Sequence, residues 1–210
     1  MPDLLWDDVG WFFDPGVMGS LPDVCVPGAS VEDWQSVLDL VVVQDWAFEY
    51  SEGTAVLPLP AAAAVLSRPA GAECPELRVW PSVDVLAIFR FYATNEIDFD
   101  VDLRELQGQE RLDVFCGLLT AIGRCLGKAV LMDSEGGDGS HPVLGFDVEV
   151  DRVVVMAEPP KVLTSMPGIG VRTGASDGCL GIKESSGGVH RQRGGVLTEP
   201  VTAGRMESGG

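Results

Sequence analysis

Apolar and polar residues alternate with two different periods along residues 1–160. Apolar positions spaced by three and four predict two amphipathic helices. The first follows Ser30, which has the position of an N-cap, and carries its apolar stripe over Trp34–Val42. The second spans Gln109–Leu126 and is followed by Gly127, a residue type common just after helix ends. A shorter helix is expected over Pro60–Leu66, where proline occupies the first position.

Segments with a period of two predict β-strands around these helices. The segment Val83–Tyr92 is apolar on both alternating faces, which predicts a central strand covered on both sides. The first 30 residues are rich in Gly and Pro, so we expect them to be irregular, with their aromatic side chains docked on the core. The other expected strands are Trp46–Tyr50, Thr54–Leu57, Leu77–Trp80, Glu96–Asp102, Ala129–Met132, Pro142–Val150 and Arg152–Ala157.

The predicted strands follow one another as hairpins and do not alternate regularly with helices. This order predicts an α+β fold, a mostly antiparallel sheet with two main helices packed on one face. The pattern holds over residues 1–160, which we interpret as one acidic domain. Residues 161–210 contain 12 of the 26 glycines and show neither period, so we expect them to form a disordered Gly-rich tail.

The net charge of −18 narrows the classes of partner. Residues 1–160 carry 28 acidic and 8 basic side chains, whereas residues 161–210 carry 4 acidic and 6 basic ones. Binding nucleic acid or an anionic membrane requires clustered Lys and Arg, so we expect neither as a partner. An acidic domain attracts basic proteins, although a high net charge also serves solubility alone.

One acidic segment alternates in the way expected of a strand with one buried face. Ile97, Phe99 and Val101 are expected to point to one side, and a row of carboxylates to the other. Three interpretations stay open: the solvated face of an outer strand, a docking strip for a partner rich in Arg and Lys, and a site for a divalent metal or for phosphate transfer. The candidate partner-binding residues are Glu96, Asp98, Asp100 and Asp102.

Catalytic motifs are scarce. Gly-x-Ser-x-Gly and a Walker-type Gly-Lys-Ser/Thr are absent, and the only histidines are His141 and His190. Ser140 precedes His141 directly, but adjacency in the chain does not make a catalytic pair. The five cysteines include no Cys-x-x-Cys, so neither a zinc site nor a disulfide framework is indicated. We therefore expect no catalytic residues, no metal and no cofactor.

Three segments together resemble small acidic immunity proteins of bacterial polymorphic toxin systems: the run Ser30–Tyr50, the strand–strand–helix block Leu77–Lys128, and the closing hairpin. The resemblance implies a protein that binds a toxin, often a basic nuclease, and blocks it, with the acidic strip providing charge complementarity. Two alternatives stay open. One is a regulatory or structural interaction module without inhibitor activity, and the other is a small-molecule or metal-dependent enzyme.

The cellular setting is inferred from sequence features alone. The N-terminus lacks the basic and apolar regions of a signal peptide, and no apolar run approaches the roughly 20 residues that span a membrane. We therefore expect a cytoplasmic protein. Lysine is scarce and Asn95 is the only asparagine, which indicates a GC-rich bacterial genome. The oligomeric state is not predicted by any of these features.

Overall fold

The computed structural model describes residues 2–69, 71–137 and 139–157, and in this part of the chain nine strands form one sheet. Their order is β3-β2-β4-β5-β6-β1-β7-β8-β9, and each neighbouring pair is antiparallel. The predicted α+β class with an antiparallel sheet is thus confirmed. The strands are β1 (Asp23–Pro27), β2 (Ala47–Glu52), β3 (Ala55–Leu57), β4 (Glu76–Ser82), β5 (Val85–Arg90), β6 (Glu96–Val101), β7 (Val130–Met132), β8 (Leu144–Asp147) and β9 (Arg152–Val155).

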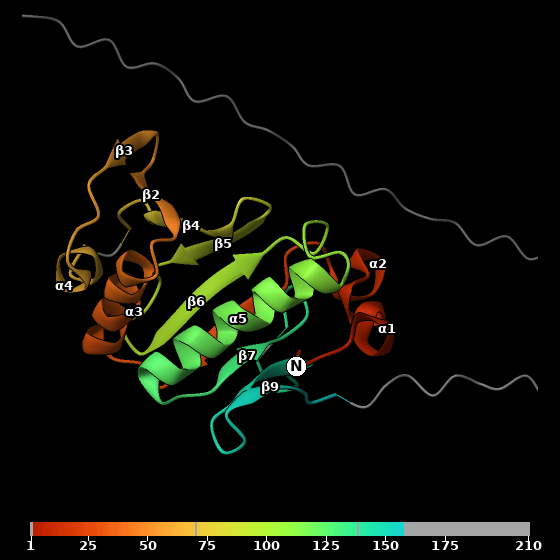
Figure 1. Cartoon of the computed structure of the whole chain (residues 1–210). Helices are drawn as coiled ribbons and strands as arrows, with labels where there is room; N and C mark the ends of the chain where they lie inside the picture. The colour runs from red at the N-terminus through yellow and green to blue at the C-terminus, as the bar shows by residue number, and fades with distance from the viewer. Residues whose placement is uncertain (1, 70, 138, 158–210) are drawn as a thin grey trace, which may run out of the picture. The chain divides into compact units, whose positions relative to one another are not determined.

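The described helices lie on one face of this sheet (Figure 1). Helix α5 (Gln109–Leu126) packs against strands from both halves of the sheet, and α3 (Val31–Val43) packs beside it. Helix α4 (Ala62–Leu66) packs on α3. The N-terminal helices lie near the start of α5, where the ring of Phe13 meets that of Phe115 edge to face. These short helices are α1 (Trp6–Val9), the 3-10 helix η1 (Gly10–Phe13) and α2 (Pro15–Met18).

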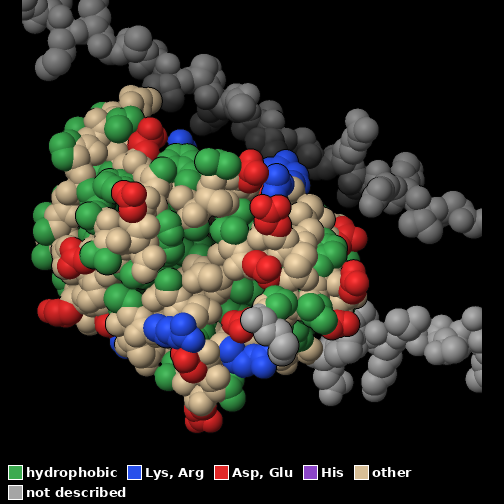
Figure 2. Space-filling view, viewed as in Figure 1, with side chains coloured by type: hydrophobic (Ala, Val, Ile, Leu, Met, Phe, Trp, Pro, Cys, Tyr) green, Lys and Arg blue, Asp and Glu red, His purple; other side chains and the backbone are tan. Residues whose placement is uncertain are grey.

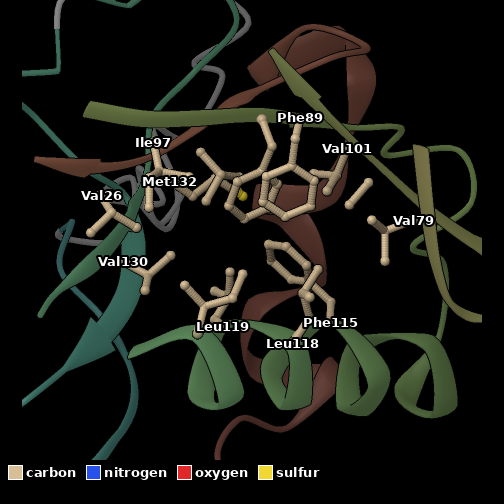
Figure 3. Close-up of a cluster of buried hydrophobic side chains, with 14 of the residues drawn as sticks. Val26, Val79, Phe89, Ile97, Val101, Phe115, Leu118, Leu119, Val130 and Met132 are labelled. Atoms are coloured by element: carbon tan, nitrogen blue, oxygen red, sulfur yellow. The ribbon is translucent and has the colours of Figure 1, made fainter. Parts of the chain in front are cut away.

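A single hydrophobic core fills the space between α5 and the sheet (Figure 3). In Figure 3, Phe115 and Leu119 of α5 point toward the strands that carry Phe89 and Ile97. All four side chains are fully buried, and the ring of Phe89 stacks on that of Phe99 with centroids 4.6 Å apart. The side chains that form this core are therefore those that recur every three or four residues in the helices and every second residue in the strands.

Local contacts fix the ends of the two main helices. Ser30 Oγ accepts a hydrogen bond from Asp33 N (3.2 Å), while the Asp33 carboxylate accepts one from Ser30 N (2.8 Å), which is a capping box. Lys128 Nζ donates to the same carboxylate at 2.7 Å. Gly127 ends α5 with a φ of 62°, a left-handed conformation that favours glycine. The start of α3 is thereby tied to the end of α5.

The structure corrects the expectation that the first 30 residues are irregular. Residues Asp23–Pro27 form β1, which lies inside the sheet between β6 and β7. Only Val24 and Val26 face the core, and both are completely buried. Two apolar positions are too few to establish a period among the surrounding Gly and Pro residues, which is why the sequence pattern misses this strand.

Two expectations about the environment of strands are also wrong. The segment Val83–Tyr92 was expected to be covered on both sides, yet β5 buries only one face, and Leu86 and Ile88 are half-buried on the other. The acidic segment was expected to be an outer strand under one interpretation, yet β6 is fifth of nine in the sheet. Hydropathy shows which side chains avoid water but not which strands become neighbours.

The closing hairpin is confirmed, since β8 pairs with β9 through a turn in which Asp151 adopts a φ of 52°. The expected Gly-rich tail, residues 161–210, lies outside the described residues. Among the helices of the described residues, none is both long enough and apolar enough to cross a membrane.

Candidate functional site

The sheet face opposite the helices consists of the side chains that alternate away from the core, and we call it the open face. Within the described residues no helix packs on it, and its side chains in the middle strands are half-buried, not fully buried. One row of consecutive cross-strand partners crosses this face over β4, β5, β6 and β1. These partners are Glu76, Arg90, Asp98 and Cys25.

Strand β6 brings the four predicted carboxylates to the open face. Ile97, Phe99 and Val101 point into the core, so the residues between them point away from it. Because β6 lies in the middle of the sheet, its charges do not serve to protect a sheet edge. The carboxylates on the open face are those of Glu96, Asp98, Asp100 and Asp102, the last of which directly follows the strand.

Two of these four carboxylates have an arginine partner. Arg90 Nε lies 2.7 Å from Asp100 Oδ2, and its other end lies 2.8 Å from a carboxylate oxygen of Glu76. Arg104 binds both carboxylate oxygens of Asp102, with its Nε 2.8 Å from Oδ1. The ion pair of Asp102 keeps the pKa of that carboxyl below its usual value. These pairs explain how like charges along β6 are tolerated.

The other two carboxylates, Glu96 and Asp98, have no hydrogen bond or ion pair with any described residue. Asp98 stands directly opposite Arg90, but the guanidinium turns along the strand to Asp100. Burial, together with the neighbouring carboxylates of Asp100, Asp23 and Glu96, raises the pKa of Asp98 to about 6. Asp98 is thus a half-buried carboxylate surrounded mainly by like charge.

A hollow of about 340 Å³ lies beside Asp98, and we call it the acidic hollow. Two of its carboxylates are not among the partner-binding residues predicted from the sequence. Asp23 lies on β1, the strand that was missed, and Asp133 directly follows β7. Burial raises the pKa of Asp23 above its usual value. The lining residues are Asp23, Cys25, Glu96, Asp98, Asp133, Gly137 and Gly139.

The loop after β7 is held over the acidic hollow by hydrogen bonds to carboxylates. Gly136 N donates to Asp23 Oδ2 at 3.0 Å, and Gly139 N donates to Asp133 Oδ2 at 2.9 Å. Gly137 passes so close to Asp133 that a Cβ at Gly137 would lie 2.6 Å from the carboxylate. The loop therefore brings backbone to these acids but no positively charged side chain.

The described residues contain no group of three or more His, Cys, Asp and Glu side chains arranged to hold a metal ion. Burial, together with nearby carboxylates, raises the pKa of the Cys25 thiol to about 11, so this thiol stays protonated near neutral pH. Ser140 Oγ lies 2.6 Å from His141 Nδ1 in an exposed loop. What the open face offers is a set of carboxylates for contact with positive charge.

Comparison with known proteins adds no family to this picture. No protein-family model matches the chain, and neither the curated proteins nor the solved structures contain a match. The interpretation of the site therefore rests on its geometry and its charges.

Proposed function

We propose that this chain binds a basic protein through the open face of its sheet and inhibits that protein, in the manner of the immunity proteins that its sequence resembles. A bacterial and cytoplasmic setting belongs to the same proposal and rests on the sequence alone. The residues assigned to the contact are Glu96 and Asp98, with Asp23 and Asp133 beside them in the acidic hollow.

The observation that carries this proposal is the state of Asp98. An ionised carboxylate that is half-buried without a counter-charge lowers the stability of the fold. Its cross-strand partner on β5, Arg90, is already bound to Asp100 and Glu76. A guanidinium or ammonium group from a partner would supply the missing ion pair. The unfavourable free energy of the unpaired Asp98 would then be relieved in the complex, which favours binding.

The distribution of charge over the surface also supports a basic partner at the open face. Figure 2 shows the helix-covered face, where Asp and Glu side chains lie scattered among hydrophobic and other residues. On the open face, by contrast, four carboxylates line one hollow without a basic side chain among the lining residues. Such a field increases the rate of encounter with basic proteins and repels nucleic acid.

The test uses the full chain immobilised on a resin and an extract of the source cells. Three forms are compared: the native chain, the pair Glu96→Gln with Asp98→Asn, and a matched control, Glu32→Gln with Glu110→Gln. Glu32 and Glu110 are exposed carboxylates on α3 and α5, so the control removes the same charge from the helix-covered side.

One basic protein retained by the native chain and by the control, but lost from the Glu96/Asp98 variant, is the expected result. Addition of the native chain should then block the activity of that protein after its purification. Equal retention by all three forms would contradict the assigned site. Retention that depends on Glu96 and Asp98 but causes no inhibition would contradict the inhibitor function. The chain would then be an interaction module without inhibitor activity.

A further inference from the structure

The part of the open face that β4 and β5 form carries hydrophobic side chains. On β4 and β5 the core-facing positions Leu77, Val79 and Ala87 are completely buried, so the residues next to them in each strand face the other way. Three of these outward residues are half-buried hydrophobic side chains that do not belong to the core cluster. They are Trp80, Leu86 and Ile88, which we call the apolar half of the open face.

Ion pairs within the chain lie on both sides of Ile88 in the apolar half. Ile88 stands between Arg78 and Asp100 as their cross-strand partner. Arg78 pairs with Glu76 at 3.1 Å, and Asp100 pairs with Arg90 at 2.7 Å. The charges beside Ile88 are therefore mostly compensated, whereas those in the acidic hollow are not.

Packing around the apolar half leaves its side chains accessible from outside. The cross-strand partner of Trp80 on β2 is Ala47, whose methyl group covers little of an indole ring. The backbone N–H of Leu86 donates to the Glu105 carboxylate at 3.0 Å. Strands with one solvated face normally carry polar residues there, so three hydrophobic side chains at these positions indicate a surface that is covered in a complex.

We infer that the partner places an aromatic side chain on Trp80, Leu86 and Ile88, next to the basic residues that it presents to Glu96 and Asp98. This inference rests on the proposed function, since the charge of the acidic hollow identifies the partner as basic. Interfaces commonly combine an apolar centre, which supplies most of the affinity, with charges that set orientation and rate of association. The two halves of the open face match that division.

The test uses two short arginine-rich peptides of equal charge, one with a tryptophan at its centre and one with an alanine there. Each is titrated at low salt into the full chain, labelled at the isoleucine methyl groups for NMR. Ile97 and Ile122 are completely buried on the helix side, so their signals are internal controls for Ile88. We expect the tryptophan peptide to bind roughly 5- to 10-fold more tightly and to shift the Ile88 signal alone among these three.

The same titrations with the variant Leu86→Thr/Ile88→Thr complete a double-mutant cycle. Both replacements place threonine, a β-branched residue suited to a strand, and circular dichroism checks that the variant is folded. The preference for tryptophan should fall to about onefold in this variant, while Val43→Thr, a change of an exposed residue on α3, should preserve it.

Each other outcome has a distinct meaning. Equal binding of the two peptides by the native chain, or an unchanged preference in the Leu86/Ile88 variant, would overturn the inference and leave the proposed function standing. Failure of both peptides to bind, or binding that persists in the Glu96→Gln/Asp98→Asn variant, would contradict the proposed function itself.

Discussion

Arg90 and Asp98 face each other as cross-strand partners on β5 and β6, but they form no ion pair. The Arg90 side chain instead reaches diagonally to Asp100, at 2.7 Å, and directly across to its partner Glu76 on β4, at 2.8 Å. Diagonal neighbours in an antiparallel pair lie within reach of long side chains, so one guanidinium joins two carboxylates on separate strands. Asp98 is consequently left half-buried beside the like charges of Asp100, Asp23 and Glu96, which Arg90 offsets only in part.

The first prediction is that Asp98→Asn stabilises the free protein at neutral pH. The pKa of Asp98 in the folded state, about 6, lies above the unfolded value of about 4, so ionisation of this group disfavours folding. For a fully buried group this shift corresponds to roughly 3 kcal/mol. Since Asp98 is only half-buried and is screened by solvent, we expect a gain of about 1 kcal/mol in urea unfolding at neutral pH.

The gain in stability of the Asp98→Asn variant should depend on pH, because it comes from removing an ionised carboxylate. Above about pH 6 the gain should be complete, and it should disappear as pH falls from about 6 to about 4, where Asp98 becomes protonated in the folded native chain. Glu110→Gln serves as the control, because a carboxylate in the first turn of α5 is favourable and its loss should not stabilise. A destabilised Asp98→Asn variant at neutral pH would contradict this interpretation of the site.

A second prediction concerns Arg90. Arg90→Met removes the cation shared by Asp100 and Glu76 and leaves both of these carboxylates of the open face without it. Because the side chains of Arg90 and Asp100 are only 25% and 13% exposed, we expect a loss of about 2 kcal/mol in the free energy of unfolding. Thermal or urea unfolding at neutral pH measures this loss. Stability equal to that of the native chain would show that the pairs with Arg90 contribute nothing.

A third prediction concerns Asp33, which stabilises the fold and is not part of the site. Its effect on stability should depend on pH in the sense opposite to that of Asp98. Its hydrogen bond with Lys128 is the main cause that lowers its pKa, so ionised Asp33 stabilises the protein. We expect Asp33→Asn to lower the free energy of unfolding by about 1 kcal/mol at neutral pH. The difference should vanish as pH falls below about 4, through the lowered pKa, and urea unfolding over this range checks it. A difference that stays constant with pH would exclude the charge of Asp33 as its cause.

Two glycines of α5 provide a matched pair for the packing of the helix on the sheet. A Cβ at Gly123 would lie 2.1 Å from the ring of Phe146, a buried residue of β8, whereas a Cβ at Gly117 would meet nothing within 4 Å. Gly117→Ala should therefore stabilise by roughly 0.5–1 kcal/mol through helix propensity, and Gly123→Ala should destabilise by about 2 kcal/mol in spite of it. Thermal unfolding of both variants measures the difference, and equal effects would show that α5 does not pack closely at Gly123.

The sequence predicts the elements of this fold well where a period extends over several turns or residues. Helices α3 and α5 and the alternation of β6 follow directly from apolar spacing. Strand β1 is missed because it has only Val24 and Val26 as buried side chains among prolines and glycines. Without β1, the position of β6 in the middle of the sheet cannot be derived, since strand order depends on contacts between distant segments.

The candidate site is predicted only in part, for the same reason. Glu96, Asp98, Asp100 and Asp102 share a face, as their spacing of two requires. Which of them are paired depends on where arginines from other strands reach, and the sequence does not encode that in any local pattern. Asp23 and Asp133 join the site through the pairing of β1 with β6 and β7, so they become visible only once the sheet is assembled.

The most direct test of the proposed function is the affinity of the retained basic protein for three forms of the full chain, measured by calorimetry as salt rises from about 50 mM to about 200 mM. The forms are the native chain, Glu96→Gln/Asp98→Asn and the control Glu32→Gln/Glu110→Gln. We expect the Glu96/Asp98 variant to bind at least about tenfold more weakly and with a smaller salt dependence, and the control to match the native chain. Equal affinities and equal salt dependence in all three forms would contradict a role of the open face in binding.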